Sequence, residues 1–137
     1  MARYTFHKEE RLCSRKLIGT LFESGRSFLC YPLKVVYYTP EVWEGDFPVQ
    51  VGFTVPKKNF KRAVKRNLLK RRIREAYRLR KHELYEYLET TEQQLGVMFI
   101  YVGKEQLSYR KIEGSVQKAI NRLKKELTKS SSAEKKA

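Results

Sequence analysis

Apolar residues recur at three- and four-residue spacing in three parts of the chain, which is the pattern of amphipathic helices. We therefore predict helices over about residues 14–24, 61–88 and 109–127. Ser14 and Ser108 stand where a side-chain oxygen can cap the first turn of the first and third helices. The apolar positions that define the three faces are Leu17, Ile18, Leu21 and Phe22, then Leu69, Ile73, Ala76, Tyr77, Leu84, Tyr87 and Leu88, then Ile112, Val116, Ala119, Ile120 and Leu123.

Three other segments are rich in β-branched and aromatic residues, which favours strands. They cover about residues 33–39, 49–55 and 95–102. The second segment alternates apolar with small or polar residues, so one of its faces is predicted to be buried. The third is apolar almost throughout, which predicts that both of its faces are covered. Residues 40–48 contain two prolines and a glycine and are predicted to form a loop.

The order of these elements predicts an α+β fold, an α/β sandwich with helices against a central mixed sheet. Written in full, the order is α-β-β-(β)-α-β-α, where the strand in parentheses is optional. At 137 residues the chain has room for one core. We expect a single domain over residues 1–128, followed by a disordered basic tail over 129–137, where no apolar residue larger than alanine occurs.

The net charge of the chain limits the classes of function that are compatible with the sequence. Lys and Arg number 30 against 15 Asp and Glu, so the formal net charge is +15. Such an excess favours a polyanionic partner, either nucleic acid or an anionic membrane surface. The longest apolar run, residues 97–102, is too short to span a bilayer. The first residues lack a secretory pattern, and Cys13 and Cys30 have neither zinc-ligand nor disulfide spacing, so we expect a cytoplasmic protein with reduced thiols.

The cations concentrate in the long central helix. Between Lys57 and Lys81 there are thirteen of them, against one acidic residue, Glu75. Solvated helix faces normally mix signs, because like charges four residues apart repel. The run therefore indicates a bound polyanion rather than a solvated face. One stripe, roughly 140° wide at 100° per residue, contains Arg66, Asn67, Lys70, Arg71, Arg74 and Arg78.

The surroundings of this helix favour RNA or single strands. A leucine-zipper DNA-binding region is excluded because no heptad of apolar residues follows Tyr77, and strands flank the helix where a helix-turn-helix would need helices. Tyr37, Tyr38 and Phe53 lie in predicted strands and could stack on unpaired bases. The alternative for each ring is a place in the core.

Residues for protein-based catalysis are scarce. A nuclease needs an acid–base pair or carboxylates that hold metal. His7 lies near the N-terminus, His82 lies on the polar part of a helix, and the acidic residues form no compact cluster. The residues thus indicate binding, with no catalytic and no metal-ligating residue in this chain. A general basic RNA-binding protein, such as a ribosomal protein, and an intrinsic nuclease stay open as alternatives.

Two blocks of sequence together form a specific signature. The first is Val51-Gly52-Phe53-Thr54-Val55-Pro56-Lys57-Lys58-Asn59, and the second runs from Ala63 to Tyr77 and contains Arg66-Asn67, Lys70-Arg71 and Arg74. In this order they resemble the signature of the bacterial ribonuclease P protein subunit. The resemblance covers about residues 11–123. Leu68 stands where the family has a second arginine, and Ile18 stands where it often has an aromatic residue.

The resemblance implies a fold and a function. The strand–helix–strand crossover that carries the motif would be left-handed, against the usual rule. The chain would assist an endoribonuclease whose RNA subunit holds the catalytic centre, bind Mg²⁺ only through that RNA, and help to remove the 5′ leader in tRNA maturation. Its partners would be the catalytic RNA and precursor tRNA, with no membrane. The residues expected to face the catalytic RNA are Lys57, Lys58, Arg62, Arg66, Asn67, Lys70, Arg71 and Arg74; a cleft between the first helix and the sheet would hold the leader with Phe22, Lys34, Val36 and Tyr38.

Overall fold

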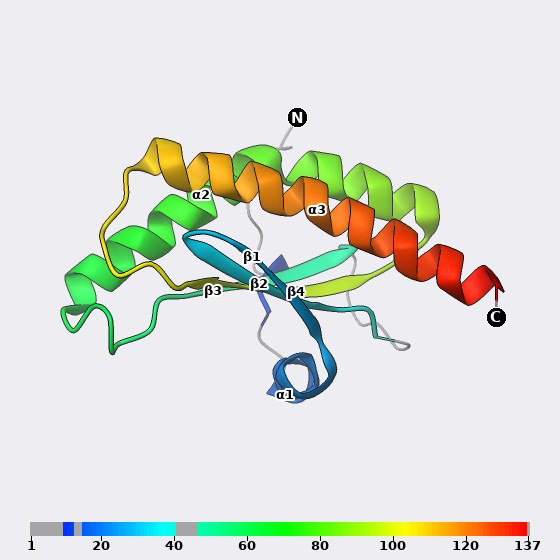
Figure 1. The fold of residues 1–137 in the computed structure, drawn as a ribbon, viewed down its shortest axis with the longest axis horizontal. Coiled ribbons are helices and arrows are strands. Elements are labelled where there is room, and N and C mark those ends of the chain that lie inside the picture. The colour runs from blue at the N-terminus through cyan, green and yellow to red at the C-terminus, as the bar shows by residue number, and fades with distance from the viewer. Residues whose placement is uncertain (1–9, 13–14, 41–46, 137) are drawn as a thin grey trace.

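The computed structural model describes residues 10–12, 15–40 and 47–136, with side chains as far as Thr128. Three helices and four strands follow one another along the chain (Figure 1). The succession of helices and strands is the predicted one with three strands before the second helix, but the additional strand, β1, precedes the two predicted strands instead of following them. The elements are α1 Arg15–Ser24, β1 Arg26–Cys30, β2 Leu33–Tyr38, β3 Val49–Thr54, α2 Ala63–Thr91, β4 Leu95–Tyr101 and α3 Tyr109–Lys136.

The four strands form one mixed sheet in the order β1-β2-β4-β3. β1 pairs antiparallel with β2, and β2 pairs antiparallel with β4. β3 and β4 are parallel neighbours joined by α2, so α2 is the crossover helix of the predicted strand–helix–strand unit. The α+β class and the mixed sheet are confirmed.

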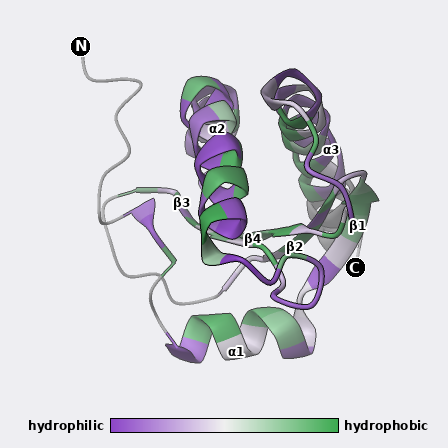
Figure 2. Ribbon diagram, turned by 90° about the vertical axis from the view of Figure 1, so that its left-hand side faces the viewer, coloured by the Kyte–Doolittle hydropathy of each residue, from purple (hydrophilic) through white to green (hydrophobic). Residues whose placement is uncertain are grey.

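The helices cover both faces of the sheet. α2 and α3 lie side by side on one face, and α1 lies alone on the other (Figures 1 and 2). The larger core fills the α2/α3 side, where Leu33, Val35 and Tyr37 of β2 are buried. A smaller core on the α1 side contains Leu12, Leu21 and Val36, with Met98 and Ile100 packed against it. β4 is thus covered on both faces, as its continuous apolar sequence predicts.

Strand β1 has no predicted counterpart at its residues. Of its five residues only Phe28 is buried, while Arg26, Ser27 and Leu29 are exposed. An edge strand of this kind lacks the apolar alternation that reveals a half-buried strand. Its place is instead set by its antiparallel pairing with β2.

Two helices have different bounds from those predicted. α2 begins after Arg62 and ends at Thr91, where Glu92 turns the chain with a left-handed backbone at φ 55°. α3 continues to Lys136, past the predicted end near residue 127 and through the segment expected to be a disordered tail. No Gly or Pro occurs after Gly114 to stop that helix. The predicted Ser108 cap of α3 is present, since the Ser108 Oγ accepts a hydrogen bond from the Lys111 N–H at 3.4 Å. The predicted Ser14 cap and most of the predicted loop over residues 40–48 lie outside the described residues.

A buried ion pair ties the segment before α1 to α2. Lys81 Nζ donates to Glu10 Oε1 at 2.5 Å, and their side chains are 5% and 0% exposed. The Tyr85 hydroxyl donates to the same oxygen at 2.6 Å. Burial raises the pKa of Tyr85, so this hydroxyl stays protonated and remains a donor at neutral pH. The contact joins residues 71 positions apart.

Removing one partner of this pair should strongly destabilise the fold. Glu10→Ala leaves the Lys81 ammonium buried without its carboxylate, which we expect to cost about 3–5 kcal/mol in the free energy of unfolding. The double variant Glu10→Gln/Lys81→Met removes both charges and should recover most of the loss. Urea denaturation measures both. Glu75→Gln, which breaks the exposed pair with Arg78, is the control and should cost less than about 1 kcal/mol; an equally small effect of Glu10→Ala would contradict the assignment.

Candidate nucleic-acid interface

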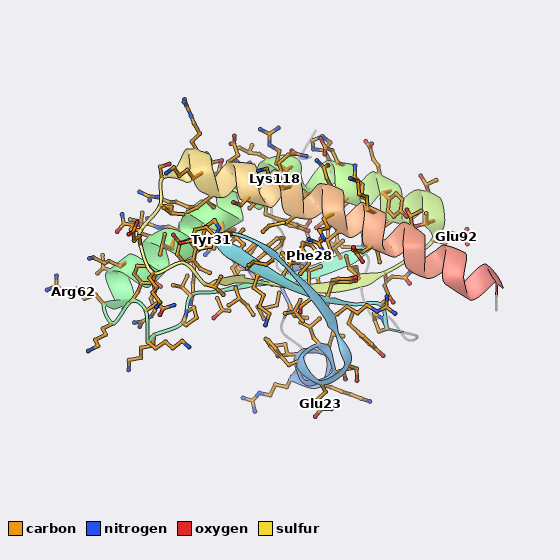
Figure 3. The ribbon with its side chains drawn as sticks, in the orientation of Figure 1. Glu23, Phe28, Tyr31, Arg62, Glu92 and Lys118 are labelled. Carbon is orange, nitrogen blue, oxygen red and sulfur yellow. The ribbon has the colours of Figure 1, made fainter. Side chains whose placement is uncertain are left out.

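The predicted RNA-facing residues come together at the N-terminal half of α2 and in the turn before it. Lys57 and Lys58 are exposed in the turn that follows β3, and Arg62 is the N-cap residue of α2. Figure 3 shows Arg62 at one end of the molecule, where several basic side chains extend outward. Along the helix Asn67, Arg71 and Arg74 are exposed, while Arg66 and Lys70 are half-buried. We call this set the α2 basic surface.

The helix end itself adds to the positive potential. The first turn of α2 has no acidic residue, and the N-cap residue Arg62 makes no side-chain hydrogen bond to the helix. The first N–H groups of a helix lack intrahelical partners and carry the positive end of the helix dipole. An acidic side chain there would normally offset this potential. In its place the chain has lysine and arginine, so phosphate is well suited to this end of the helix.

Some cations of the run have structural partners within the protein. Arg66 donates through Nη1 to the carbonyl oxygens of Phe60 at 2.7 Å and Lys61 at 2.8 Å, and so holds the turn before α2. Arg72 Nη1 donates to the Leu107 carbonyl at 2.7 Å, across to the β4–α3 connection.

Further along α2, two more arginines form ion pairs. Arg78 pairs with Glu75 at 2.6 Å, and Arg80 pairs with Glu113 of α3 at 3.3 Å. The hydrogen bond from Arg78 lowers the pKa of the Glu75 carboxyl, so that pair is charged at neutral pH. The described residues provide no ion pair for Arg62, Lys70, Arg71 or Arg74, and these four are available to an external anion.

The residues predicted for the leader lie on the other side of the sheet, the side that α1 covers. Phe22 of α1 is 54% exposed, and Lys34 of β2 is exposed. Tyr38 is half-buried and packs against the smaller core. Val36 is only 6% exposed and belongs to that core. The prediction from strand parity that Lys34, Val36 and Tyr38 share one face of β2 is thus correct. Val36 contributes to the packing of the smaller core and is not accessible on the surface.

Strand pairing places three further residues, which the sequence did not indicate, in a row with the predicted residue Lys34. Leu29 of β1 lies beside Lys34, Lys34 beside Ile100 of β4, and Ile100 beside Thr54 of β3, all on the α1 side. Leu29 is 58% exposed although it is apolar. No signal in the sequence could have found it, because strand β1 was not recognisable. Together with Phe22 and Tyr38, these four residues form what we call the α1-side surface.

Two of the three rings considered for base stacking are core residues instead. Tyr37 is 5% exposed, and Phe53 stacks on Phe99 with ring centroids 5.9 Å apart. Both pack in the larger core, on the α2/α3 side. Only Tyr38 of the three lies on the α1-side surface.

Candidate catalytic groups are not brought together. His82 is half-buried on α2, and His7 lies outside the described residues. Within the described part of the chain, no group of three His, Cys, Asp or Glu side chains is placed to hold a metal ion. None of the helices described is long and apolar enough to cross a membrane.

Comparison with known proteins agrees with this geometry. The family model described as Ribonuclease P matches residues 6–124. The chain belongs to the ribonuclease P protein family. A relative from Porphyromonas gingivalis (strain ATCC 33277), "Ribonuclease P protein component", is 38% identical over 122 residues, which cover 89% of this chain and 88% of the relative. A relative of the same name from Chlorobium phaeobacteroides is 36% identical over 106 residues, covering 72% and 73% of the two chains.

Solved structures of ribonuclease P proteins share the fold. The Staphylococcus aureus protein superposes with a TM-score of 0.65 at 20% identity, covering 85% of this chain and 95% of that one. The Thermotoga maritima protein gives a TM-score of 0.64 at 22% identity, covering 82% and 96%. The sequence resemblance is therefore confirmed, and a ribonuclease P protein component implies an RNA partner in a ribonucleoprotein.

Substitution of Arg72 should affect stability and substitution of Arg74 should affect RNA binding, because among the described residues Arg72 has a hydrogen-bond partner and Arg74 has none. Arg72→Ala removes a charged hydrogen bond to the Leu107 carbonyl and should lower the free energy of unfolding by roughly 1.5–3 kcal/mol. Arg74→Ala should leave stability within about 0.5 kcal/mol of the parent. It should weaken RNA binding and reduce the slope of log affinity against log salt by about 0.9, the value for one phosphate contact. Thermal denaturation and RNA titrations over a series of KCl concentrations measure the two effects. A loss of stability in Arg74→Ala with a loss of RNA binding alone in Arg72→Ala would contradict these assignments.

Proposed function

We propose that this chain is the protein subunit of ribonuclease P, binding both the catalytic RNA subunit and the 5′ leader of precursor tRNA. In this role it assists the endonucleolytic removal of the leader during tRNA maturation in the cytoplasm. The observation that supports the proposal is the presence of two chemically different surfaces on opposite sides of one sheet. The α2 basic surface is suited to phosphates, and the α1-side surface combines exposed apolar groups with a lysine.

The α2 basic surface is proposed to bind the catalytic RNA. Arg62, Lys70, Arg71 and Arg74 have no ion pair among the described residues, so their charges are not neutralised within the protein. RNA phosphates would neutralise them and release condensed counterions, which favours association. Asn67 is exposed in the same stripe and can donate its amide N–H groups to a phosphate oxygen. The turn that holds Lys57 and Lys58 lies next to the helix end and extends the surface.

The α1-side surface is proposed to bind the leader. A single strand exposes its bases, and aromatic side chains bind them with little sequence preference because every base has a π-face. Phe22 is exposed to accept such a base, and Lys34 is placed on the sheet to contact a phosphate. Leu29 and Ile100, on either side of Lys34, supply apolar contacts. Tolerance of sequence is what leaders require, since they differ between precursor tRNAs.

The chemistry of cleavage is proposed to belong to the RNA subunit, as the family resemblance implies. Mg²⁺ would be bound by the RNA. The protein's cations would lower the repulsion between the catalytic RNA and the substrate, and so reduce the concentration of Mg²⁺ that the complex needs. The side chains of this chain thus position two RNAs and neutralise charge.

The purified protein should therefore cleave precursor tRNA only together with the RNA subunit. Adding the protein to that RNA should lower the Mg²⁺ concentration at which cleavage reaches half its maximal rate. Gel assays of leader release, with and without each component, measure this. Cleavage by the protein after exhaustive removal of RNA, abolished by His82→Ala, would support an intrinsic nuclease. RNA binding without any effect on leader release would support a general RNA-binding protein.

Loss of an exposed ring on the α1-side surface should weaken binding of leader-bearing substrate selectively. Phe22→Leu removes one stacking partner, worth roughly 1–3 kcal/mol, so the holoenzyme's affinity for precursor tRNA should fall about 5- to 160-fold. Affinity for mature tRNA should not change. Tyr38→Leu should act in the same direction, with some loss of stability because Tyr38 also packs against the smaller core.

The matched control for the leader measurement is Thr20→Ala, on the same helix. The Thr20 hydroxyl donates to the Lys16 carbonyl within α1, so its removal should leave both substrates unaffected. Equal losses for precursor and mature tRNA in Phe22→Leu would show that the ring acts only through packing.

A further inference from the structure

A separate hollow lies between the β1–β2 turn and the first half of α3. Its volume is about 400 Å³, within the range of roughly 300–1,000 Å³ that small-molecule sites occupy. Tyr31 and Pro32 line it from the turn, and Arg110, Lys111, Gly114 and Lys118 line it from α3. Figure 3 shows Tyr31 at the turn and Lys118 on the helix above. None of these residues belongs to the α2 basic surface or the α1-side surface.

The turn is held in place by two hydrogen bonds to its carbonyl groups. Ser115 Oγ of α3 donates to the Tyr31 carbonyl at 2.7 Å, and the Val102 N–H donates to the Pro32 carbonyl at 2.8 Å. The main chain of the turn is thus fixed between α3 and the end of β4. The Tyr31 side chain is nevertheless 60% exposed. An exposed aromatic ring on a fixed backbone can stack on another planar group.

Gly114 keeps the wall of the hollow open. A Cβ atom built on this residue meets nothing within 4 Å, so close packing does not require glycine. Glycine inside a helix is less favourable than any other residue except proline. The glycine therefore costs helix stability while it leaves space beside Tyr31 that a longer side chain would occupy.

The charges around the hollow favour an anion. Residues 109–128 of α3 contain six lysines and arginines and two acidic residues. Both acidic residues face arginines, with Glu113 at 3.3 Å from Arg80 and Glu126 at 3.7 Å from Arg122. The described residues provide no ion pair for Arg110, Lys111 or Lys118. Three uncompensated cations thus surround one exposed ring.

We propose that this hollow binds one nucleotide of a single-stranded RNA segment, with the base against Tyr31 and the phosphate held by Lys111, Lys118 and Arg110. A nucleotide combines a planar ring with a phosphate, which is the combination that these side chains recognise. The site rests on the proposed function only in that RNA is the ligand. It lies on the α2/α3 side of the sheet, so a strand bound there would be distinct from one on the α1-side surface.

Photocrosslinking locates this contact directly. The probe is a short oligouridylate that carries 4-thiouridine, mixed with the full-length protein, irradiated and mapped by mass spectrometry. We expect a crosslink in the peptide that contains Tyr31, in addition to crosslinks on α1 or α2. Tyr31→Leu should reduce the crosslink at the turn by about tenfold, in keeping with the loss of one stacked base.

The variant Gly114→Gln distinguishes a loss of RNA binding in the hollow from a loss of folded protein. The glutamine should fill the space beside Tyr31 and reduce the crosslink at the turn by about tenfold, while the melting temperature stays the same or rises, because glutamine is a better helix former than glycine. Gly19→Gln is the matched control, since Gly19 of α1 is also exposed with nothing within 4 Å of its Cβ position. It should leave the crosslink at the turn unchanged.

The outcomes separate this site from the proposed function. Crosslinks on α1 or α2 but none at Tyr31, or a Tyr31 crosslink that Gly114→Gln does not reduce, would overturn the site and leave the proposed function standing. A Tyr31 crosslink that Gly114→Gln removes, in a protein that neither binds the RNA subunit nor promotes leader release, would support the site and overturn the proposed function.

Discussion

Burial of β4 on both faces is the constraint on which the rest of the structure depends. Its side chains alternate between two cores, with Phe99 and Tyr101 toward α2 and α3, and Met98 and Ile100 toward α1. A central strand of this kind cannot be left uncovered on either side, since each buried large side chain contributes about 1.5–3 kcal/mol. Two of the helices that cover it, α1 and α2, also contribute residues to the α1-side surface and the α2 basic surface. Both surfaces therefore depend on the packing around this one strand.

The larger core lets α2 carry an unfavourable charge distribution. Cations four residues apart repel by a few tenths of a kcal/mol for each pair, and those near the first turn also oppose the helix dipole. Against this, Leu69, Ile73 and Tyr77 are fully buried under the same stretch of helix, and their burial outweighs the repulsion several-fold. The helix can thus stay folded although several of its charges have no ion pair among the described residues.

The sequence predicted those parts of the molecule that depend on local pattern. Strand parity placed Lys34 and Tyr38 correctly, and periodicity found all three helices. Features that depend on contacts between residues far apart in the sequence could not be predicted. Arg72 and Arg74 look alike in the sequence, yet within the described ranges Arg72 alone of the two donates to a carbonyl, that of Leu107, 35 positions away. The Glu10–Lys81 pair was not predicted for the same reason. Strand β1 was not predicted because its mostly exposed residues show no alternation of apolar and polar side chains.

Site-specific crosslinking from the two sides of the sheet tests most directly whether the two surfaces bind different RNAs. A photoactivatable reagent would be attached to Phe22→Cys or Arg74→Cys, each in a chain whose Cys13 and Cys30 are replaced by serine, and the holoenzyme would be irradiated with precursor tRNA bound. We expect crosslinks from position 22 to leader nucleotides and from position 74 to the catalytic RNA. Crosslinks from both positions to the same RNA, or the opposite assignment, would contradict this expectation.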